Sequence, residues 1–174
     1  MPRSVTIVDY DPQWPLLFER ERSRLLPAMG DRVVSFQHVG STSVPGLSAK
    51  PTVDMMVGVR QEADAQDCVP LLIELGYTYK PATQLEIPGW YFLDRRTADG
   101  EDYHLHMVVY GSDFWNRHLL FRDYLRSHPE VARQYEALKR ELAFQYGTDR
   151  MGYCDAKTDF IQSVEALARH AANS

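Results

Sequence analysis

The residues of this sequence best suited to chemistry lie in a loop at 38–50, at Asp54, and in the short segment 104–106. In the loop, Gly40 allows the backbone to approach a ligand closely, and the Ser-Thr-Ser run after it offers hydroxyl groups and amides. Such groups are suited to holding phosphate. The loop therefore predicts an anion-binding site, although the same residue types also form ordinary turns.

Asp54 lies in the segment 52–59, whose nearly continuous apolar character is typical of a central strand with both faces covered. Side chains alternate between the faces of a strand, so Asp54 and Met56 are expected on the same face. Met56 then occupies the position where a second carboxylate would bind a metal. A thioether is a poor ligand for Mg²⁺, but one carboxylate can hold a Mg²⁺ that takes its other ligands from water and substrate phosphates.

A second predicted strand, 103–110, places His104 and His106 on one face, and His38 precedes Gly40 by two residues. Imidazoles together with one carboxylate suit Zn²⁺, Mn²⁺ or Fe²⁺. One of these histidines could instead serve as a general acid or base, or contact phosphate. A His-x-His pair on a strand is also typical of structural or solvent-facing histidines, so these interpretations stay open.

The elements that must position these residues follow one another along the chain. The apolar spacing of 12–28 predicts a surface helix, with Asp11 as its N-cap. From 113 to the end the pattern is helical, with breaks near 128–129 and 147–154. Strands are predicted at 32–40, 52–59, 77–80, 90–96 and 103–110, and a helix at 62–75 ended by Gly76.

This order of one helix, a mixed sheet and about three further helices predicts a single α+β domain over residues 1–174. Residues 1–111 would carry the sheet. Residues 113–172 would form C-terminal helices that pack on the sheet or beside its cleft.

Composition narrows the classes of partner. The chain has 174 residues, a net charge of -5 and a pI near 5.6, which argues against a broad basic face for extended nucleic acid. Any nucleotide is therefore expected as a small molecule. The absence of a signal-peptide core and of an apolar run of membrane-spanning length predicts a soluble cytoplasmic protein with no membrane partner. Cys68 and Cys154 are expected to be reduced thiols.

The spacing from Val39-Gly40-Ser41 to Asp54 resembles the signature of the nucleotidyltransferase superfamily. Five blocks resemble the GrpB family, a group of small bacterial proteins that shares this fold, and together they run from about Asp9 to Ile161. The blocks are "YDPQWPLLFERE", "HVGSTSVPGLSAKPTVDMMV", "YHLHMVV", "FRDYLRSHPEVARQYEALK" and "YCDAKTDFI".

The resemblance implies a nucleotidyltransferase-like mixed sheet with flanking helices. In that superfamily the glycine motif holds the triphosphate, strand acids hold divalent metal, and a later strand supplies a third acid. His104 or His106 would take the place of that acid. The C-terminal helices often line the pocket, which makes Arg122 and Lys157 phosphate contacts. The predicted phosphate or nucleotide contacts are Gly40, Ser41, Thr42, Ser43, Lys50, Arg122 and Lys157.

The predicted catalytic residues are Asp54, His104 and His106, and the predicted metal ligands are these three with His38. The implied cofactor is Mg²⁺ or Mn²⁺, with Zn²⁺ as the alternative, and the implied substrates are a nucleoside triphosphate and a small acceptor.

Three functions stay open at this point. The first is metal-dependent nucleotidyl transfer, and the second is a catalytically reduced module that binds a nucleotide or cofactor. The third is a metal-dependent enzyme of another class that uses the His/Asp cluster. The base, the acceptor and the oligomeric state are not fixed by the sequence.

Overall fold

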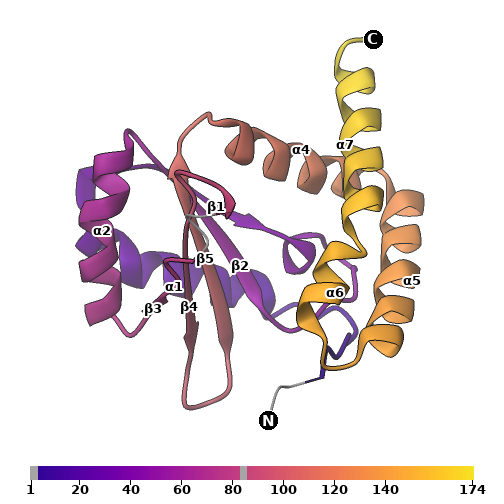
Figure 1. Ribbon diagram of the computed structural model, residues 1–174, viewed down its shortest axis with the longest axis horizontal. Helices are drawn as coiled ribbons and strands as arrows, with labels where there is room; N and C mark the ends of the chain where they lie inside the picture. The colour runs from indigo at the N-terminus through magenta and orange to yellow at the C-terminus, as the bar shows by residue number, and fades with distance from the viewer. Residues whose placement is uncertain (1–3, 83–85) are drawn as a thin grey trace.

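The computed structural model describes residues 4–82 and 86–174, and its centre is a five-stranded sheet (Figure 1). In this sheet β2 and β5 are parallel, and every other neighbouring pair is antiparallel. The sheet is therefore mixed, which confirms the predicted α+β class. The strands, in their order across the sheet, are β1 (Val33–Val39), β2 (Val53–Val59), β5 (Asp102–Val109), β4 (Tyr91–Arg96) and β3 (Thr78–Tyr79).

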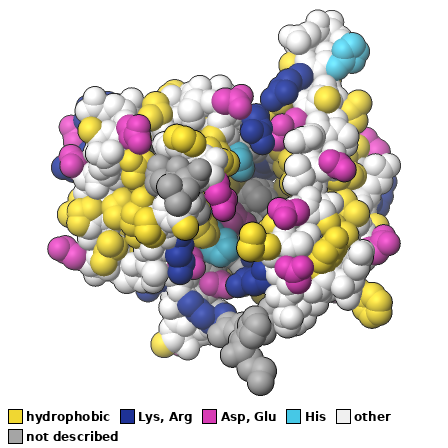
Figure 2. All heavy atoms as spheres, in the orientation of Figure 1, with side chains coloured by type: hydrophobic (Ala, Val, Ile, Leu, Met, Phe, Trp, Pro, Cys, Tyr) yellow, Lys and Arg dark blue, Asp and Glu magenta, His cyan; other side chains and the backbone are white. Residues whose placement is uncertain are grey.

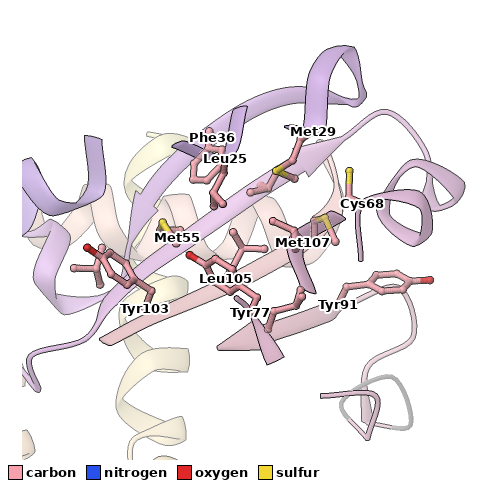
Figure 3. Close-up of a cluster of buried hydrophobic side chains, with 14 of the residues drawn as sticks. Leu25, Met29, Phe36, Met55, Cys68, Tyr77, Tyr91, Tyr103, Leu105 and Met107 are labelled. Atoms are coloured by element: carbon pink, nitrogen blue, oxygen red, sulfur yellow. The ribbon is translucent and has the colours of Figure 1, made fainter. Parts of the chain in front are cut away.

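One face of the sheet is covered by α1 (Trp14–Met29) and α2 (Glu62–Glu74), and the main hydrophobic core lies between them and the strands (Figure 3). Burial of these apolar side chains is the main force that holds the helices to the sheet. The strands contribute the odd-numbered residues of β2 and β5 to this core. They are Val53, Met55, Val57, Val59, Tyr103, Leu105 and Met107.

On the other side of the sheet lie the helices that follow β5, at the right of the view in Figure 1, and the first of them contacts β1 and β5. These helices are α4 (Asp113–Ser127), α5 (Pro129–Tyr146), α6 (Arg150–Asp155) and α7 (Thr158–Ala172). On this face Met56 packs with Val39, Val108 and Trp115 in a small apolar cluster. Asp54 shares the face with Met56, as alternation predicts.

Two local predictions are corrected by the structure. Gln13, not Asp11, occupies the N-cap position of α1; the Asp11 carboxylate instead accepts a hydrogen bond of 2.9 Å from the Gln13 amide. The predicted break at 147–154 contains the short helix α6, because Asp149 caps it by accepting a 2.9 Å hydrogen bond from the Gly152 amide. The C-terminal segment therefore has four α-helices where about three were predicted.

Two turns complete the path to the site. Gly76 has φ +89° just after α2, which fits the predicted helix end. The loop after β1 forms a short 3-10 helix, η2 (Ser41–Ser43).

Within 4–82 and 86–174, no helix combines the length and apolar character needed to cross a membrane.

Candidate functional site

The parallel register of β2 and β5 brings Asp54 beside two histidines. Asp54 pairs with His104, and Met56 pairs with His106, so both imidazoles lie next to the Asp54 side chain. The Oδ1 atom of Asp54 is 3.4 Å from His104 Nδ1 and 3.5 Å from His106 Nε2. Three of the predicted site residues therefore meet at one point.

The Asp54 carboxylate is only partly exposed, with 28 % of its side chain accessible to solvent. Desolvation by burial would on its own raise its pKa, because burial disfavours the charged form. Hydrogen bonds and positive charge from His104 and His106 outweigh this effect and hold the pKa of Asp54 well below its ordinary value. The site is therefore built around an ionised carboxylate.

Gly40 closes the other side of this carboxylate. Its backbone has φ 72° and ψ -174°, a conformation that is essentially restricted to glycine. A Cβ atom at this position would lie 2.7 Å from Asp54 Oδ2, which is closer than carbon and oxygen can approach. The loop at Gly40 and the Asp54 carboxylate are therefore in direct contact, as expected from the spacing between Val39-Gly40-Ser41 and Asp54 in the sequence.

Trp90 orients the His106 ring. Its indole Nε1–H donates a 3.1 Å hydrogen bond to His106 Nδ1, and the two rings stack with centroids 5.8 Å apart. Because Nδ1 accepts this bond, the proton of a neutral His106 lies on Nε2, the nitrogen that faces Asp54. A metal would need a lone pair on that same nitrogen, so this arrangement suits a proton donor better than a metal ligand.

His38 is not part of this cluster, which corrects the prediction that it is a fourth metal ligand. It pairs with Met55 in the sheet, and its ring stacks on Phe18 of α1 with centroids 4.9 Å apart. Its Nε2 lies 2.9 Å from Thr42 Oγ1. Burial lowers the pKa of His38 to about 4, with the charges of Arg126 and Arg122 acting in the same direction. His38 is therefore a neutral structural residue.

A protein-held metal centre does not fit these residues. Asp54, His104 and His106 lie close together, but among residues 4–82 and 86–174 no three His, Cys, Asp or Glu side chains have the arrangement that could hold a metal ion. The second acid position is Met56, which is fully buried among apolar side chains. This arrangement disfavours both a two-metal site and a zinc or iron site built on the histidine cluster.

A cavity of about 360 Å³ opens at this carboxylate. Figure 2 shows the molecule hollowed between the sheet and the C-terminal helices, with histidine, acidic and basic side chains at the hollow. Among the described residues that line it, four have basic side chains and one, Asp54, has a carboxylate. This basic cavity is lined by Ser41, Thr42, Ala49, Lys50, Asp54, Trp90, Phe92, His104, His106, Lys139, Arg150, Tyr153, Cys154 and Lys157.

Helix α5 fixes the loop that carries Lys50 by binding Ser48. The Lys139 ammonium donates to the Ser48 carbonyl, and the Glu136 carboxylate accepts a 3.3 Å hydrogen bond from the Ser48 amide. The Arg140 guanidinium donates to the Ser48 hydroxyl at 3.0 Å. Three side chains from adjacent turns of α5 therefore set the position of Lys50 at the cavity.

Two of the cavity lysines have lowered pKa values. Burial, with the charge of Lys157 adding to it, lowers the pKa of Lys139 to about 7. Burial also lowers the pKa of Lys157, whose ammonium lies 4.3 Å from the centroid of the Tyr153 ring. Both shifts favour loss of a proton, so an anion in the cavity would stabilise the charged lysines.

The predicted phosphate contacts divide into two groups. Ser41, Thr42, Lys50 and Lys157 line the basic cavity. The Ser43 hydroxyl instead donates to the Gly40 carbonyl and so stabilises the loop itself.

Arg122 lies on the outer side of β1, which corrects its prediction as a phosphate contact. It donates to the His38 carbonyl at 3.0 Å and to Gln37 Oε1 at 2.8 Å, and it pairs with Asp123 at 2.8 Å. These contacts engage its guanidinium with β1 and its own helix. Arg122 therefore supports the strand that precedes Gly40.

Sequence reasoning missed Lys139, Arg150 and Trp90. A signal existed for Lys139, because it lies four residues after Tyr135 and three before Leu142 in the buried stripe of α5. A lysine at a core position of an amphipathic helix indicates a specific partner. Arg150 lies on the short helix inside a predicted break, where the sequence shows no such pattern.

We expect Gly40→Ala to lower the free energy of unfolding more than Gly30→Ala, a matched control. Gly30 has a similar backbone, φ 64° and ψ -144°, but a Cβ there would meet no atom within 4 Å. Gly30→Ala should cost only the backbone strain of about 1–3 kcal/mol, whereas Gly40→Ala must also displace Asp54. Urea denaturation of both variants measures the difference; equal losses would contradict the close approach to Asp54.

Lys139→Met should remove part of the pH dependence of stability. With a pKa of about 7 in the folded chain and 10.5 in the reference state, Lys139 is deprotonated in the folded state but protonated in the unfolded state between these values. The unfolded state then binds one more proton, so stability rises with pH by up to about 1.4 kcal/mol per pH unit. Denaturation at pH 7.5 and 9.5 should show a smaller rise in the variant; identical slopes would contradict the lowered pKa.

Comparisons with known proteins agree with this architecture. Residues 4–167 match the family model described as GrpB protein. A UPF0157 protein of Halalkalibacterium halodurans is 37% identical over 163 residues, which cover 92% of this chain and 80% of the relative. The crystal structure of conserved protein GrpB from Enterococcus faecalis superposes with a TM-score of 0.84 at 29% identity, over 97% of this chain and 100% of that one.

One similarity is to part of a longer chain. A protein of Mycolicibacterium paratuberculosis named dephospho-CoA kinase is 28% identical over 192 residues, which cover 98% of this chain and 47% of that protein. The family match spans nearly all of the residues that build the sheet, the carboxylate site and the basic cavity. The chain therefore belongs to the GrpB family.

Proposed function

We propose that this chain binds a nucleotide, with the phosphates held in the basic cavity. The observation that carries this proposal is the charge of the cavity: Lys50, Lys139, Arg150 and Lys157 surround one carboxylate in a chain whose net charge is -5. Clustered cations repel one another, so an anion that binds among them would relieve this repulsion. Phosphate is the anion that Lys and Arg bind best.

The loop at Gly40 would complete the phosphate site. Ser41 and Thr42 line the cavity beside the strand carboxylate, and the bare Gly40 backbone allows the loop that carries them to lie directly against Asp54. The imidazoles of His104 and His106 would offer N–H groups to phosphate oxygens, and Asp54 would hold these rings in place. This assignment makes the site a catalytically reduced nucleotide- or cofactor-binding module.

A divalent metal would enter with the nucleotide in this proposal. Asp54 is the single carboxylate among the described residues that line the basic cavity. One carboxylate is sufficient for Mg²⁺ or Mn²⁺ when phosphates and water supply the other ligands. Zn²⁺ is the alternative, but it would need a lone pair on His106 Nε2, which the Trp90 hydrogen bond disfavours. The similarity to a protein named dephospho-CoA kinase agrees with a nucleotide-bearing ligand.

Binding of inorganic tripolyphosphate, ATP and Mg²⁺–ATP, measured by calorimetry, tests this proposal. Removing a charge-assisted hydrogen bond should weaken binding about tenfold or more in Lys50→Met and Lys157→Met. Arg60→Met is the matched control, since Arg60 follows the opposite end of β2 and its side chain is 56% exposed. Absence of binding by all three ligands, or equal binding by the cavity variants, would overturn the proposal.

Nucleotidyl transfer to a small acceptor is the second candidate function. It is favoured by the contact of Gly40 with Asp54, which joins the loop and the acid that such an enzyme needs. In this function Asp54 would bind the metal that accompanies the triphosphate, and the lysines would neutralise charge on the phosphates. His104 or His106 would then contact the acceptor hydroxyl or amine.

Release of pyrophosphate separates the two functions. With a nucleoside triphosphate, Mg²⁺ or Mn²⁺, and a set of small alcohols and amines, we expect transfer to be lost in Asp54→Asn. Tripolyphosphate binding by this variant should change by less than about threefold, because the carboxylate is not its main partner. If pyrophosphate release persists in Asp54→Asn, this active site is ruled out. If the wild type releases no pyrophosphate, nucleotidyl transfer is ruled out and the binding function remains.

A further inference from the structure

A second cavity, of about 250 Å³, adjoins the basic cavity. At three places along the chain, one residue lines the second cavity and a nearby residue lines the basic cavity. Gly40 lines the second cavity and Ser41 the basic one; Tyr135 lines the second and Lys139, one turn later on α5, lines the basic one. Thr158 lines the second cavity and Lys157 the basic one. The two cavities therefore share a wall along the loop, α5 and the start of α7.

The second cavity differs from the basic one in having flat apolar walls. Phe121 and Tyr135 meet edge to face, with centroids 5.4 Å apart, and Ile161 lies beside them. His118 also lines the second cavity, and one face of its ring stacks on Phe114 with centroids 4.0 Å apart. Such walls fit a planar group that has apolar faces.

The charged groups of the second cavity are paired with each other, so the cavity carries little net charge. Arg117 and Glu165 form an ion pair of 3.2 Å, and the Gln162 amide lies on the same helix as Glu165. Together they present both hydrogen-bond donors and acceptors. An anion would gain little here, whereas an uncharged ligand with donors and acceptors along its edge would be recognised.

His118 adds one acceptor of known orientation. Its Nδ1–H donates a 2.7 Å hydrogen bond to the Phe114 carbonyl, which leaves Nε2 with a lone pair. Burial, together with the charge of His106, lowers the pKa of His118 to about 4, so the ring is neutral at ordinary pH. A neutral imidazole can accept a hydrogen bond from an amino group.

From these walls and edges we infer that the second cavity is the nucleobase subsite of the nucleotide whose phosphates occupy the basic cavity. A nucleobase is planar, stacks on aromatic rings and carries donors and acceptors on its edge, which matches the walls and the paired polar groups. The shared wall allows one ligand to reach from one cavity to the other. This inference rests on the proposed phosphate site and adds the part of the ligand that the cations do not recognise.

Comparison of inorganic tripolyphosphate with ATP, GTP, CTP and UTP tests the inference by calorimetry on the full chain. Stacking and edge contacts should make at least one nucleotide bind about tenfold or more tightly than tripolyphosphate. Gln162→Trp should fill the second cavity from an exposed helix position, and so bring nucleotide affinity down to that of tripolyphosphate. Tripolyphosphate binding itself should change less than about twofold.

Leu167→Trp is the control, because Leu167 is an exposed residue of the same helix and does not line the second cavity. Leu167→Trp should leave the affinities for tripolyphosphate and for the nucleotides unchanged. A melting temperature equal to that of the wild type in both variants shows that the fold is intact. If tripolyphosphate binds but the nucleoside adds no affinity, or if Gln162→Trp binds nucleotides as the wild type does, the base subsite is overturned while the phosphate site stands. If neither kind of ligand binds, both are overturned.

Discussion

The site depends on one ionised carboxylate that is held between a backbone and two imidazoles. Asp54 touches the bare Gly40 backbone on one side and contacts His104 and His106 on the other. A partly buried carboxylate is costly without such partners, so the loop after β1, strand β2 and strand β5 behave as one unit. Trp90, the residue before β4, extends the unit by fixing the His106 ring.

Much of this unit was predictable because it follows from local patterns. Alternation along a strand places Asp54 with Met56, and a glycine at position 40 predicts a close approach of the backbone. The face on which His38 lies was not predictable, because it depends on the antiparallel register that pairs His38 with Met55. The spacing between His38 and Gly40 contains no information about that register.

The positions of the basic side chains were likewise not predictable from the sequence. Lys139 and Arg150 reach the cavity only because α5 packs against α6 and binds the loop at Ser48, which is a tertiary property. Arg122 shows the opposite case, since a helix arginine expected at the cavity is engaged by the β1 backbone. Charge on a helix was visible in the sequence, but the direction in which the helix presents it was not.

The binding of Ser48 by α5 has a consequence for how the chain folds. The Lys139 ammonium and the Ser48 carbonyl are 91 positions apart, so this contact closes a long loop and cannot form until α5 is complete. The strands and α1 can assemble first around their own apolar core, without a finished cavity. Completion of the cavity would then be a late step, and a chain arrested before α5 would have the sheet but not the lysine that closes it.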